Sequence, residues 1–338
     1  MTTTAAKTKS SRLRGVAKPS QPKKSAAWKL HRSGGLQILE APQLARLDWL
    51  THGFSTRPGG ASEVPPAGPA EGAPLKRAAS GGAGALNLGF TDWDTRDRVV
   101  ENRGKFFRAL GAGKMRVVTL RQIHSDAIHC VDRADFPAGS DGDPAEAPKA
   151  DALVTREPHV ILAVQTADCV PILLADPKRR AVAAIHSGWR GTLARIAAKT
   201  LGRMQMEFGT RAADVIAALG PGIGRCCYEV GSDVVRDFHA QFPEAREWFD
   251  GPFDALASGE NDPNWLPWLT MRPPGHPPPP PSVHLDLIAA NRAILAAAGV
   301  PPRQISALDF CTACRTDLFF SYRRERTTGR LMAAIGIR

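Results

Sequence analysis

The chain has 338 residues, 43% of them hydrophobic and 7% aromatic, so it can bury a full core in one large domain or two smaller ones. Its formal net charge of +11 suggests a nucleic-acid partner, but eight of the 44 basic residues lie within residues 1–30, where there is no acid. The rest holds 36 basic against 33 acidic groups, which leaves no strongly basic body and predicts no nucleic-acid partner.

Residues 1–35 are rich in Thr, Ser, Ala and Lys, which is typical of a disordered, solvated tail. The composition also resembles an organellar transit peptide, but no amphipathic helix is evident. Neither a secretory signal nor a run of eighteen apolar residues occurs, so we expect a cytoplasmic protein with no membrane partner. Six cysteines in a chain this long do not require a disulfide framework, and reduced thiols are expected.

Ordered structure is predicted to begin near Leu36 and to form one domain over residues 36–338, with loop-like inserts near 61–84 and 253–282. Apolar runs typical of strands occur at residues 36–39, 49–54, 117–123, 150–154, 160–164, 170–175, 181–185 and 215–219. Helical spacing of apolar residues predicts helices over residues 96–110, 193–204, 231–242 and 283–298. Two last runs, residues 318–323 and 330–337, predict a β-hairpin.

The most informative stretch is residues 160–190, where polar residues follow apolar strands. Asp168 and Cys169 separate two apolar runs, and a third run ends at His186. Since strands fix the backbone while their ends reach solvent, this arrangement is typical of a site built on rigid elements. A helix that follows directly would also place residues 186–191 at its N-terminus, where free backbone N–H groups favour an anion.

Three side chains at predicted strand ends, His124, Cys169 and His186, form a ligand set suited to zinc. Three protein ligands leave a fourth position for water or substrate. The rival chemistry uses Cys169 as a nucleophile with His186 as its base, and a buried, inert cysteine is the third interpretation. No close-spaced pair such as C-x-x-C joins the three residues, so their spacing leaves these alternatives open.

Other cysteines carry weaker signals. Cys311 and Cys314 form a C-x-x-C that fits a redox pair or half a zinc site, but no second C-x-x-C exists, so core thiols are favoured. Cys226 and Cys227 are adjacent and are predicted to be structural.

A glycine-rich segment and three arginines are weaker candidates for anion binding. The glycine-rich residues 220–224 lack the Lys-Ser/Thr of a P-loop, so a tight turn is expected there. Arg57, Arg190 and Arg323 lie beside strand or loop ends and could clamp an anion in bidentate geometry, although each also fits a surface salt bridge.

Several motifs together resemble one family. They are HGFSTR at residues 52–57, LNLG at 86–89, QIHS at 122–125, TADCVP at 166–171, HSGWRG at 186–191, GPGI at 220–223 with CYEV at 227–230, and FFSYRR at 319–324. From about residue 36 onwards, the chain resembles the purine nucleoside phosphorylases long described as laccase-domain or multicopper polyphenol oxidase proteins. The commonest form of the HSGWRG motif in that family has Ala where this chain has Ser187.

The resemblance implies a four-layered α/β/β/α fold with mixed sheets in a single domain, similar to the deamidase domain of cytotoxic necrotizing factor toxins. It implies zinc bound by His124, Cys169 and His186, with copper as the alternative metal. The implied reactions are phosphorolysis of adenosine, inosine and methylthioadenosine, and deamination of adenosine, so a purine nucleoside and phosphate are the expected partners. A bacterial branch is linked to peptidoglycan editing. A cysteine or metal hydrolase for cell-wall precursors and a non-catalytic metal-binding module are therefore the alternatives.

The three ligand residues are also the predicted catalytic residues, together with Asp168, which we expect to orient a ligand histidine or to move a proton. The predicted substrate-binding residues are Arg57, Gln122, Arg190 and Arg323. Laccase chemistry is disfavoured, because nine scattered histidines without H-x-H pairs do not supply a trinuclear copper cluster.

Overall fold

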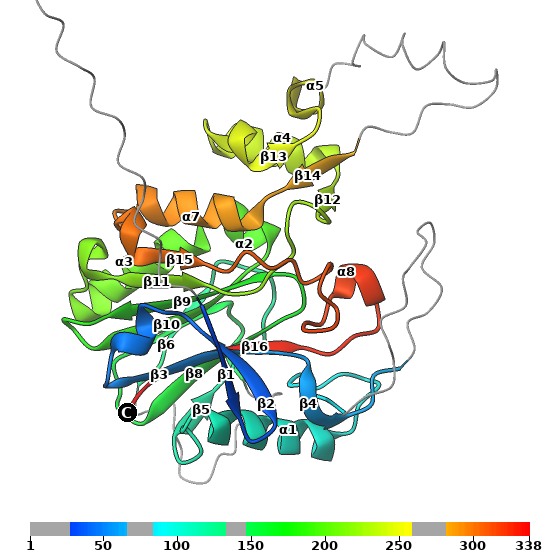
Figure 1. Ribbon diagram of the computed structural model, residues 1–338. Coiled ribbons are helices and arrows are strands. Elements are labelled where there is room, and N and C mark those ends of the chain that lie inside the picture. Colours follow the sequence, from blue (N-terminus) through cyan, green and yellow to red (C-terminus); the bar gives the residue numbers. More distant parts are fainter. Residues whose placement is uncertain (1–27, 66–83, 133–146, 259–281) are drawn as a thin grey trace, which may run out of the picture.

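The computed structural model describes residues 28–65, 84–132, 147–258 and 282–338. Two six-stranded sheets lie face to face, with α1 (Arg96–Ala109) below one of them and α2 (Trp189–Leu193), α3 (Ile196–Phe208) and α7 (Leu287–Ala297) above the other (Figure 1). The layers therefore run α/β/β/α, which confirms the predicted single domain of mixed sheets. Within the described residues, no helix combines the length and apolar character needed to cross a bilayer.

The first sheet contains the last strand of the chain near its centre. Its order is β1 (Lys29–Ser33), β2 (Leu36–Glu40), β3 (Leu50–Ser55), β16 (Leu331–Ile337), β8 (Val160–Thr166) and β5 (Arg116–Val118). β16 pairs antiparallel with both neighbours, so Ala333 lies between Phe54 and Val164. β5 is parallel to β8, and all other pairs of this sheet are antiparallel.

The second sheet is built around a hairpin. Its order is β15 (Ile305–Ala307), β11 (Ile216–Leu219), β9 (Val170–Asp176), β10 (Ala181–Ser187), β7 (Ala152–Thr155) and β6 (Ile128–Cys130). β9 and β10 form the hairpin, whose register sets His186 opposite Pro171. The outer pairs β11–β15 and β6–β7 are parallel.

The central strands of both sheets are buried on both faces. Because successive side chains of a strand point to opposite faces, Leu173 of β9 packs between the sheets while Ile172 faces the helices. Leu162 of β8 likewise lies between the sheets, and Ile161 faces α1. This two-sided burial explains why the strands read as continuous apolar runs.

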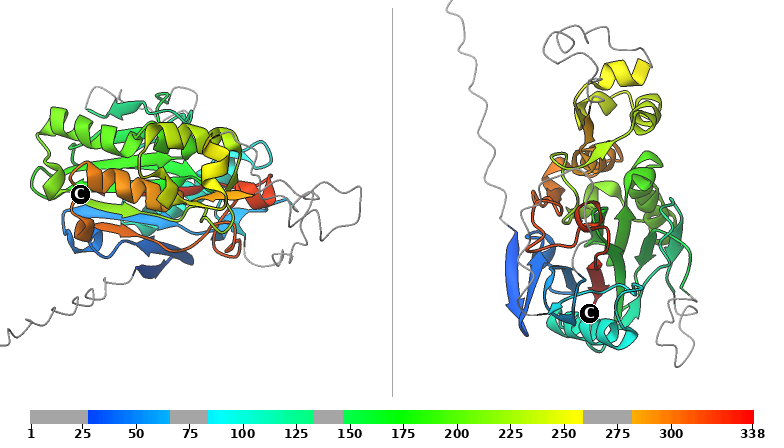
Figure 2. Two further views of the ribbon diagram at one scale, coloured as in Figure 1. Left: turned by 90° about the horizontal axis from the view of Figure 1, so that it is seen from above. Right: turned by 90° about the vertical axis from the view of Figure 1, so that its right-hand side faces the viewer.

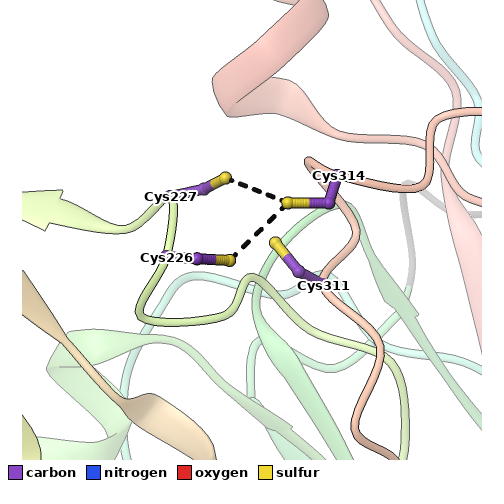
Figure 3. A group of neighbouring side chains, drawn as sticks. All are labelled: Cys226, Cys227, Cys311 and Cys314. Carbon is purple, nitrogen blue, oxygen red and sulfur yellow. Dashed lines mark hydrogen bonds between the residues drawn. The ribbon is translucent and has the colours of Figure 1, made fainter.

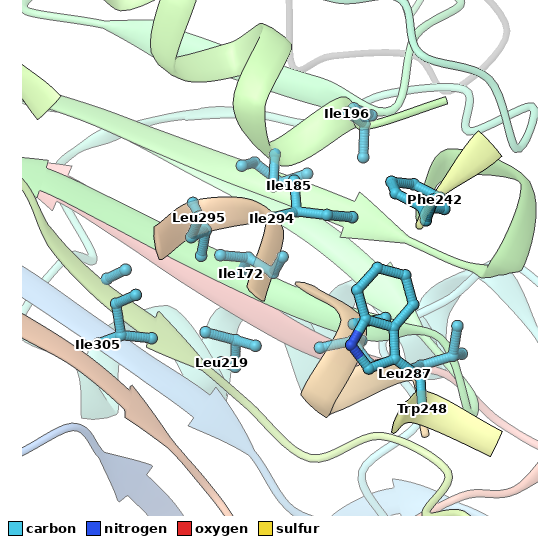
Figure 4. Packing of buried hydrophobic residues seen from close by; sticks show 14 of the residues in the cluster. Ile172, Ile185, Ile196, Leu219, Phe242, Trp248, Leu287, Ile294, Leu295 and Ile305 are labelled. Atoms are coloured by element: carbon cyan, nitrogen blue, oxygen red, sulfur yellow. The ribbon is translucent and has the colours of Figure 1, made fainter. Parts of the chain in front are cut away.

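The largest core cluster fills the space between the second sheet and its helices. Figure 4 shows Ile172 and Leu219 of the sheet packing with Ile294 and Leu295 of α7 and with Trp248. From above, α3 and α7 run side by side over this sheet (Figure 2). The remaining elements are α4 (Ser232–Gln241), α5 (Phe253–Ser258), α8 (Tyr322–Glu325), β4 (Pro58–Ser62), the small sheet β12 (Glu229–Val230), β14 (Val283–Leu285) and β13 (Phe249–Asp250), and 3-10 turns at Leu44–Arg46, Ala212–Asp214, Ala245–Trp248 and Pro302–Gln304.

Helix ends explain two differences from the sequence predictions. The helix predicted from residue 193 is two helices, because Arg195 adopts a left-handed φ of 59° between α2 and α3. The helix predicted over 283–298 begins later, since β14 comes first and the carboxylate of Asp286 then caps α7 by accepting the N–H of Ala289 at 2.8 Å.

Four other predictions need correction. Lys29–Ser33 forms β1 against β2, so order begins before Leu36; its polar sequence suits an exposed edge strand. The strand predicted over 117–123 is only Arg116–Val118. β4 extends into the start of the insert predicted at 61–84, and α5 forms the start of the insert predicted at 253–282. The C-terminal hairpin is wrong, because β16 pairs with β3 and β8. Residues 1–27 of the predicted tail, and 66–83 and 259–281 of the predicted inserts, lie outside the described residues.

Candidate metal centre

The β9–β10 hairpin brings Cys169 and His186 to the same end of the second sheet. Cys169 immediately precedes β9, and His186 lies opposite Pro171 in β10. His124 reaches them from the segment between β5 and β6, with a left-handed φ of 57°. Its Nε2 lies 3.9 Å from Sγ of Cys169, and its ring centroid lies 4.8 Å from that of His186. The predicted three residues are thus together, with all potential ligand atoms within 4.8 Å of one another.

The centre has a closed side and an open side. His186 is buried, Cys169 is half-buried and His124 is exposed. Gly188 lines the space beside the sulfur, where an added Cβ would lie 2.8 Å from Sγ of Cys169 and 3.4 Å from Cδ2 of His124. Only glycine therefore leaves this space free.

One buried carboxylate supports two of the three residues. Asp151 accepts a hydrogen bond from Nδ1 of His186 at 2.9 Å, which leaves Nε2 to face Cys169. It also accepts the backbone N–H groups of His124 at 3.0 Å and of Ser125 at 2.6 Å. Asp151 is a residue that sequence reasoning missed; the available signal was a carboxylate at the start of the apolar run of β7.

The charges of the centre reinforce one another. Burial by itself raises the pKa of the Cys169 thiol, but His186 and His124 outweigh it and lower that pKa to about 6. Burial lowers the pKa of His186, yet Cys169 and Asp151 raise it to about 9. Burial also raises the pKa of Asp151, and its hydrogen bonds from His186 and Ser125 bring it down to about 2. Near pH 7 these interactions favour a thiolate at Cys169.

Asp168 connects the centre to the C-terminal segment. It has a φ of 95°, and its carboxylate accepts the hydroxyl of Thr312 at 2.7 Å and the N–H of Arg323 at 2.6 Å. Among the described residues, the carboxylate that orients a histidine of the centre is Asp151, in place of the Asp168 expected from the sequence.

Tyr228 stands beside the centre and was also missed as a site residue. It is half-buried, and the guanidinium of Arg323 lies 5.2 Å from its ring centroid. Burial raises the pKa of its hydroxyl and the charge of Cys169 adds to this effect. Tyr228 therefore stays protonated at neutral pH. Its place in the CYEV motif was the available signal.

The four predicted substrate-binding residues fall into two groups. Arg57 pairs with Glu325 at 2.6 Å, and Gln122 exchanges two hydrogen bonds with the backbone of Gln165 at 2.7 Å each. Arg190 is exposed over the ring of Trp189, and Arg323 donates to the backbone carbonyl of Glu229. In the described part of the chain, the guanidinium groups of Arg190 and Arg323 are not paired with a carboxylate.

Ser187 anchors the strand that carries His186. Its hydroxyl donates to Oδ1 of Asn291 at 2.9 Å and lies 3.0 Å from the hydroxyl of Thr192. Asn291 in turn donates to Thr192 at 2.9 Å, and all three residues are buried. The serine thus joins β10 to α2 and α7 through polar contacts that an alanine would not make.

Fold and site together define a class: four-layered α/β/β/α proteins with an open cluster of one thiol and two imidazoles at the end of a central hairpin. The chain belongs to the family described as multi-copper polyphenol oxidoreductase laccase, whose model matches residues 51–338. A solved structure of this kind, YlmD from Geobacillus stearothermophilus, is 32% identical with a TM-score of 0.68, covering 91% of this chain and 98% of its own.

Two similar proteins carry the names of nucleoside-processing enzymes. A purine nucleoside phosphorylase of Deinococcus radiodurans is 36% identical over 306 residues, which cover 90% of this chain and 94% of the relative. The adenosine deaminase RL5 of an unknown prokaryotic organism is 36% identical over 228 residues, 67% of this chain and 77% of the relative. These comparisons support a nucleoside-processing enzyme of this family.

Proposed function

We propose that this protein is a zinc-dependent purine nucleoside phosphorylase acting on adenosine, inosine and methylthioadenosine, with adenosine deaminase activity. The observation that carries the proposal is the open cluster of His124, Cys169 and His186, beside two arginines whose guanidinium groups have no carboxylate partner among the described residues. The names of the relatives supply the substrate class.

The cluster fits zinc. One thiolate and two imidazoles are borderline-soft ligands, and three protein ligands leave a position for water or substrate. The lowered pKa of Cys169 and the hydrogen bond from His186 to Asp151 are features of metal-binding side chains. Copper accepts the same donors, but among the described residues the only other group of three or more potential ligands consists of four cysteines, which offers no imidazoles for a multicopper cluster. When bound, zinc would supply Lewis-acid polarisation or an activated water.

The roles of the protein side chains follow from their contacts. We assign phosphate to Arg190 and Arg323, because Arg57 is occupied by Glu325. Guanidinium groups bind phosphate oxygens in bidentate geometry. In phosphorolysis, an oxygen of hydrogen phosphate bonds to ribose C1′ while the bond from C1′ to the purine nitrogen breaks, and the proton of the phosphate ends on that nitrogen. We also assign a substrate contact to Tyr228, whose hydroxyl stays protonated at neutral pH and can donate a hydrogen bond.

A second candidate rests on the pairing of Cys169 with His186. The same lowered pKa that favours a metal ligand also activates a cysteine nucleophile. A hydrolase acting on an amide of a cell-wall precursor would then use the thiolate directly and would need no metal.

The two candidates are separated by incubating adenosine with zinc-loaded protein, with and without phosphate. We expect ribose 1-phosphate only when phosphate is present, inosine from deamination, and loss of both products after chelation. Cys169→Ser should lose both activities, whereas Cys130→Ser, a matched change in β6, should keep them. A zinc-loaded protein that yields neither product contradicts the proposal, and an amidase activity that survives chelation but not Cys169→Ala establishes the hydrolase.

A further inference from the structure

We propose that Cys226, Cys227, Cys311 and Cys314 bind a second zinc ion in a closed, four-thiolate structural site (Figure 3). This site is separate from the cluster of His124, Cys169 and His186 and shares no ligand with it. It does not depend on which reaction the protein catalyses.

Two segments far apart in the sequence meet at these cysteines. Cys226 and Cys227 follow the turn after β11, and Cys311 and Cys314 follow β15, which pairs in parallel with β11. The N–H of Thr312 donates to the carbonyl of Gly222 at 3.0 Å, which continues this pairing into the loops. The sheet therefore holds both segments in register at the cysteines.

The spacing of the sulfur atoms matches a tetrahedral metal site. Sγ of Cys314 lies 3.4 Å from that of Cys227 and 3.6 Å from that of Cys226, and all four sulfur atoms lie within 4.8 Å of one another. A Zn–S bond of about 2.3 Å gives sulfur–sulfur separations of about 3.8 Å in a tetrahedron. A disulfide needs about 2.05 Å and joins only two of the four atoms.

The exposure of the cluster argues against ordinary core packing. Cys226 and Cys314 are exposed, whereas free cysteines without a special role are usually buried. Four clustered thiols at a surface are prone to oxidation. A bound ion removes that reactivity, since each sulfur is then a metal ligand.

The surrounding backbone and charges suit a metal–thiolate group. A side chain at Gly224 would crowd the cysteines, because its Cβ would lie 3.2 Å from Cβ of Cys311. Zn²⁺ with four thiolates carries a net charge of about −2, and basic residues adjoin the ligands in the sequence at Arg225 and Arg315.

The second ion would fix one wall of the first centre. Tyr228 directly follows Cys227, and Thr312, between the two other cysteines, donates its hydroxyl to Asp168 at 2.7 Å. Loss of the second ion is therefore expected to loosen Tyr228 and Asp168 without removing any of His124, Cys169 and His186.

Metal analysis of the full-length protein, purified under reducing conditions, tests the proposal. We expect two zinc ions per chain in the wild type, one in His124→Ala/Cys169→Ser, one in Cys311→Ser/Cys314→Ser, and two in the control Cys130→Ser. Cobalt loaded into His124→Ala/Cys169→Ser should show the intense sulfur-to-metal absorption of a four-thiolate site. Chelation should lower the Tm of that variant.

The variant His124→Ala/Cys169→Ser keeps the test decisive even if the cysteine variant fails to fold, because its four cysteines are intact. A folded form of this variant that binds neither zinc nor cobalt overturns the proposal. So does a mass, measured without reductant, that shows disulfides among the four cysteines of freshly purified protein.

Discussion

The two cysteine-containing clusters of this protein are held in different ways. Cys169 and His186 sit at the end of one rigid hairpin, with the buried Asp151 behind them and the exposed His124 in front. The four cysteines come from two loops, with no carboxylate or imidazole among them. Strand ends and a supporting carboxylate hold ligands in place while leaving one side open to substrate. Loops suffice where an ion itself completes the structure.

The clusters also differ in what surrounds them. His186 is 4% exposed and Asp151 is fully buried, so the first cluster depends on hydrogen bonds that offset the cost of burying charge. The cysteine cluster lies at the surface. Substitution of residues that hydrogen-bond to the ligands should therefore lower metal affinity more at the first cluster than at the cysteine cluster.

The largest expected difference is in pH dependence. Without metal, His186 keeps its proton up to a pKa of about 9, while Cys169 has already lost its proton above about 6. A metal must therefore displace one proton, so zinc affinity at the first cluster should rise about tenfold per pH unit between pH 6 and 9. Competition with a chromophoric chelator, using Cys311→Ser/Cys314→Ser, measures this slope.

The cysteine site, measured in His124→Ala/Cys169→Ser, should show a steeper slope because more than one thiol must lose a proton. Equal slopes at the two sites, or no slope at the first, would remove the distinction between them.

Asp151→Asn should weaken zinc binding at the first cluster by about 100-fold, since ligand histidines rely on such hydrogen bonds. The amide also presents a donor to the N–H groups of His124 and Ser125. Activity should fall with the metal content. The matched control is Asp176→Asn, another buried aspartate at the opposite end of β9. Unchanged zinc affinity in Asp151→Asn would show that this carboxylate does not support the centre.

Thr312→Val probes the connection between the clusters. It removes one hydrogen bond to the buried carboxylate of Asp168 and should lower the free energy of unfolding by about 2 kcal/mol. Both metal ions should remain bound, and KM should rise more than kcat falls. Denaturant unfolding and steady-state kinetics measure these effects. Loss of metal from the first cluster would contradict the prediction, because it would show that metal binding there depends on the hydrogen bond between Thr312 and Asp168.

The smallest effect is expected for Ser187→Ala. Oδ1 of Asn291 loses its donor, while Asn291 still donates to Thr192, so stability should fall by about 1 kcal/mol. Zinc affinity should be unchanged, as measured by the same competition assay. A gain in stability would show that the hydrogen bonds of Ser187 do not offset the free-energy cost of burying its hydroxyl group.

Local sequence patterns predicted the positions of the strands better than the pairing between strands. The apolar runs located β8, β9 and β10 and placed Cys169 and His186 at strand ends, because those signals are contained in a few neighbouring residues. The run of β16 was also found, but its pairing was not, since an apolar strand fits many neighbours.

The missed site residues depend on long-range contacts. Asp151 reaches His186 across 35 positions, and Cys227 meets Cys314 across 87. The second contact follows from the parallel pairing of β11 and β15, which the sequence pattern does not specify. No spacing rule for metal motifs covers ligands that a sheet brings together in this way.

The central place of β16 has a consequence for synthesis on the ribosome. β3 and β8 each need β16 as a neighbour, so both strands have an unpaired edge until residue 337 has been made. At typical elongation rates, roughly 10–30 s pass between the synthesis of β8 and that of β16. During that time the nascent chain exposes two apolar strand edges, which are templates for aggregation. Chains that stop before Leu331 would keep those edges permanently, so we expect them to be bound by chaperones and degraded.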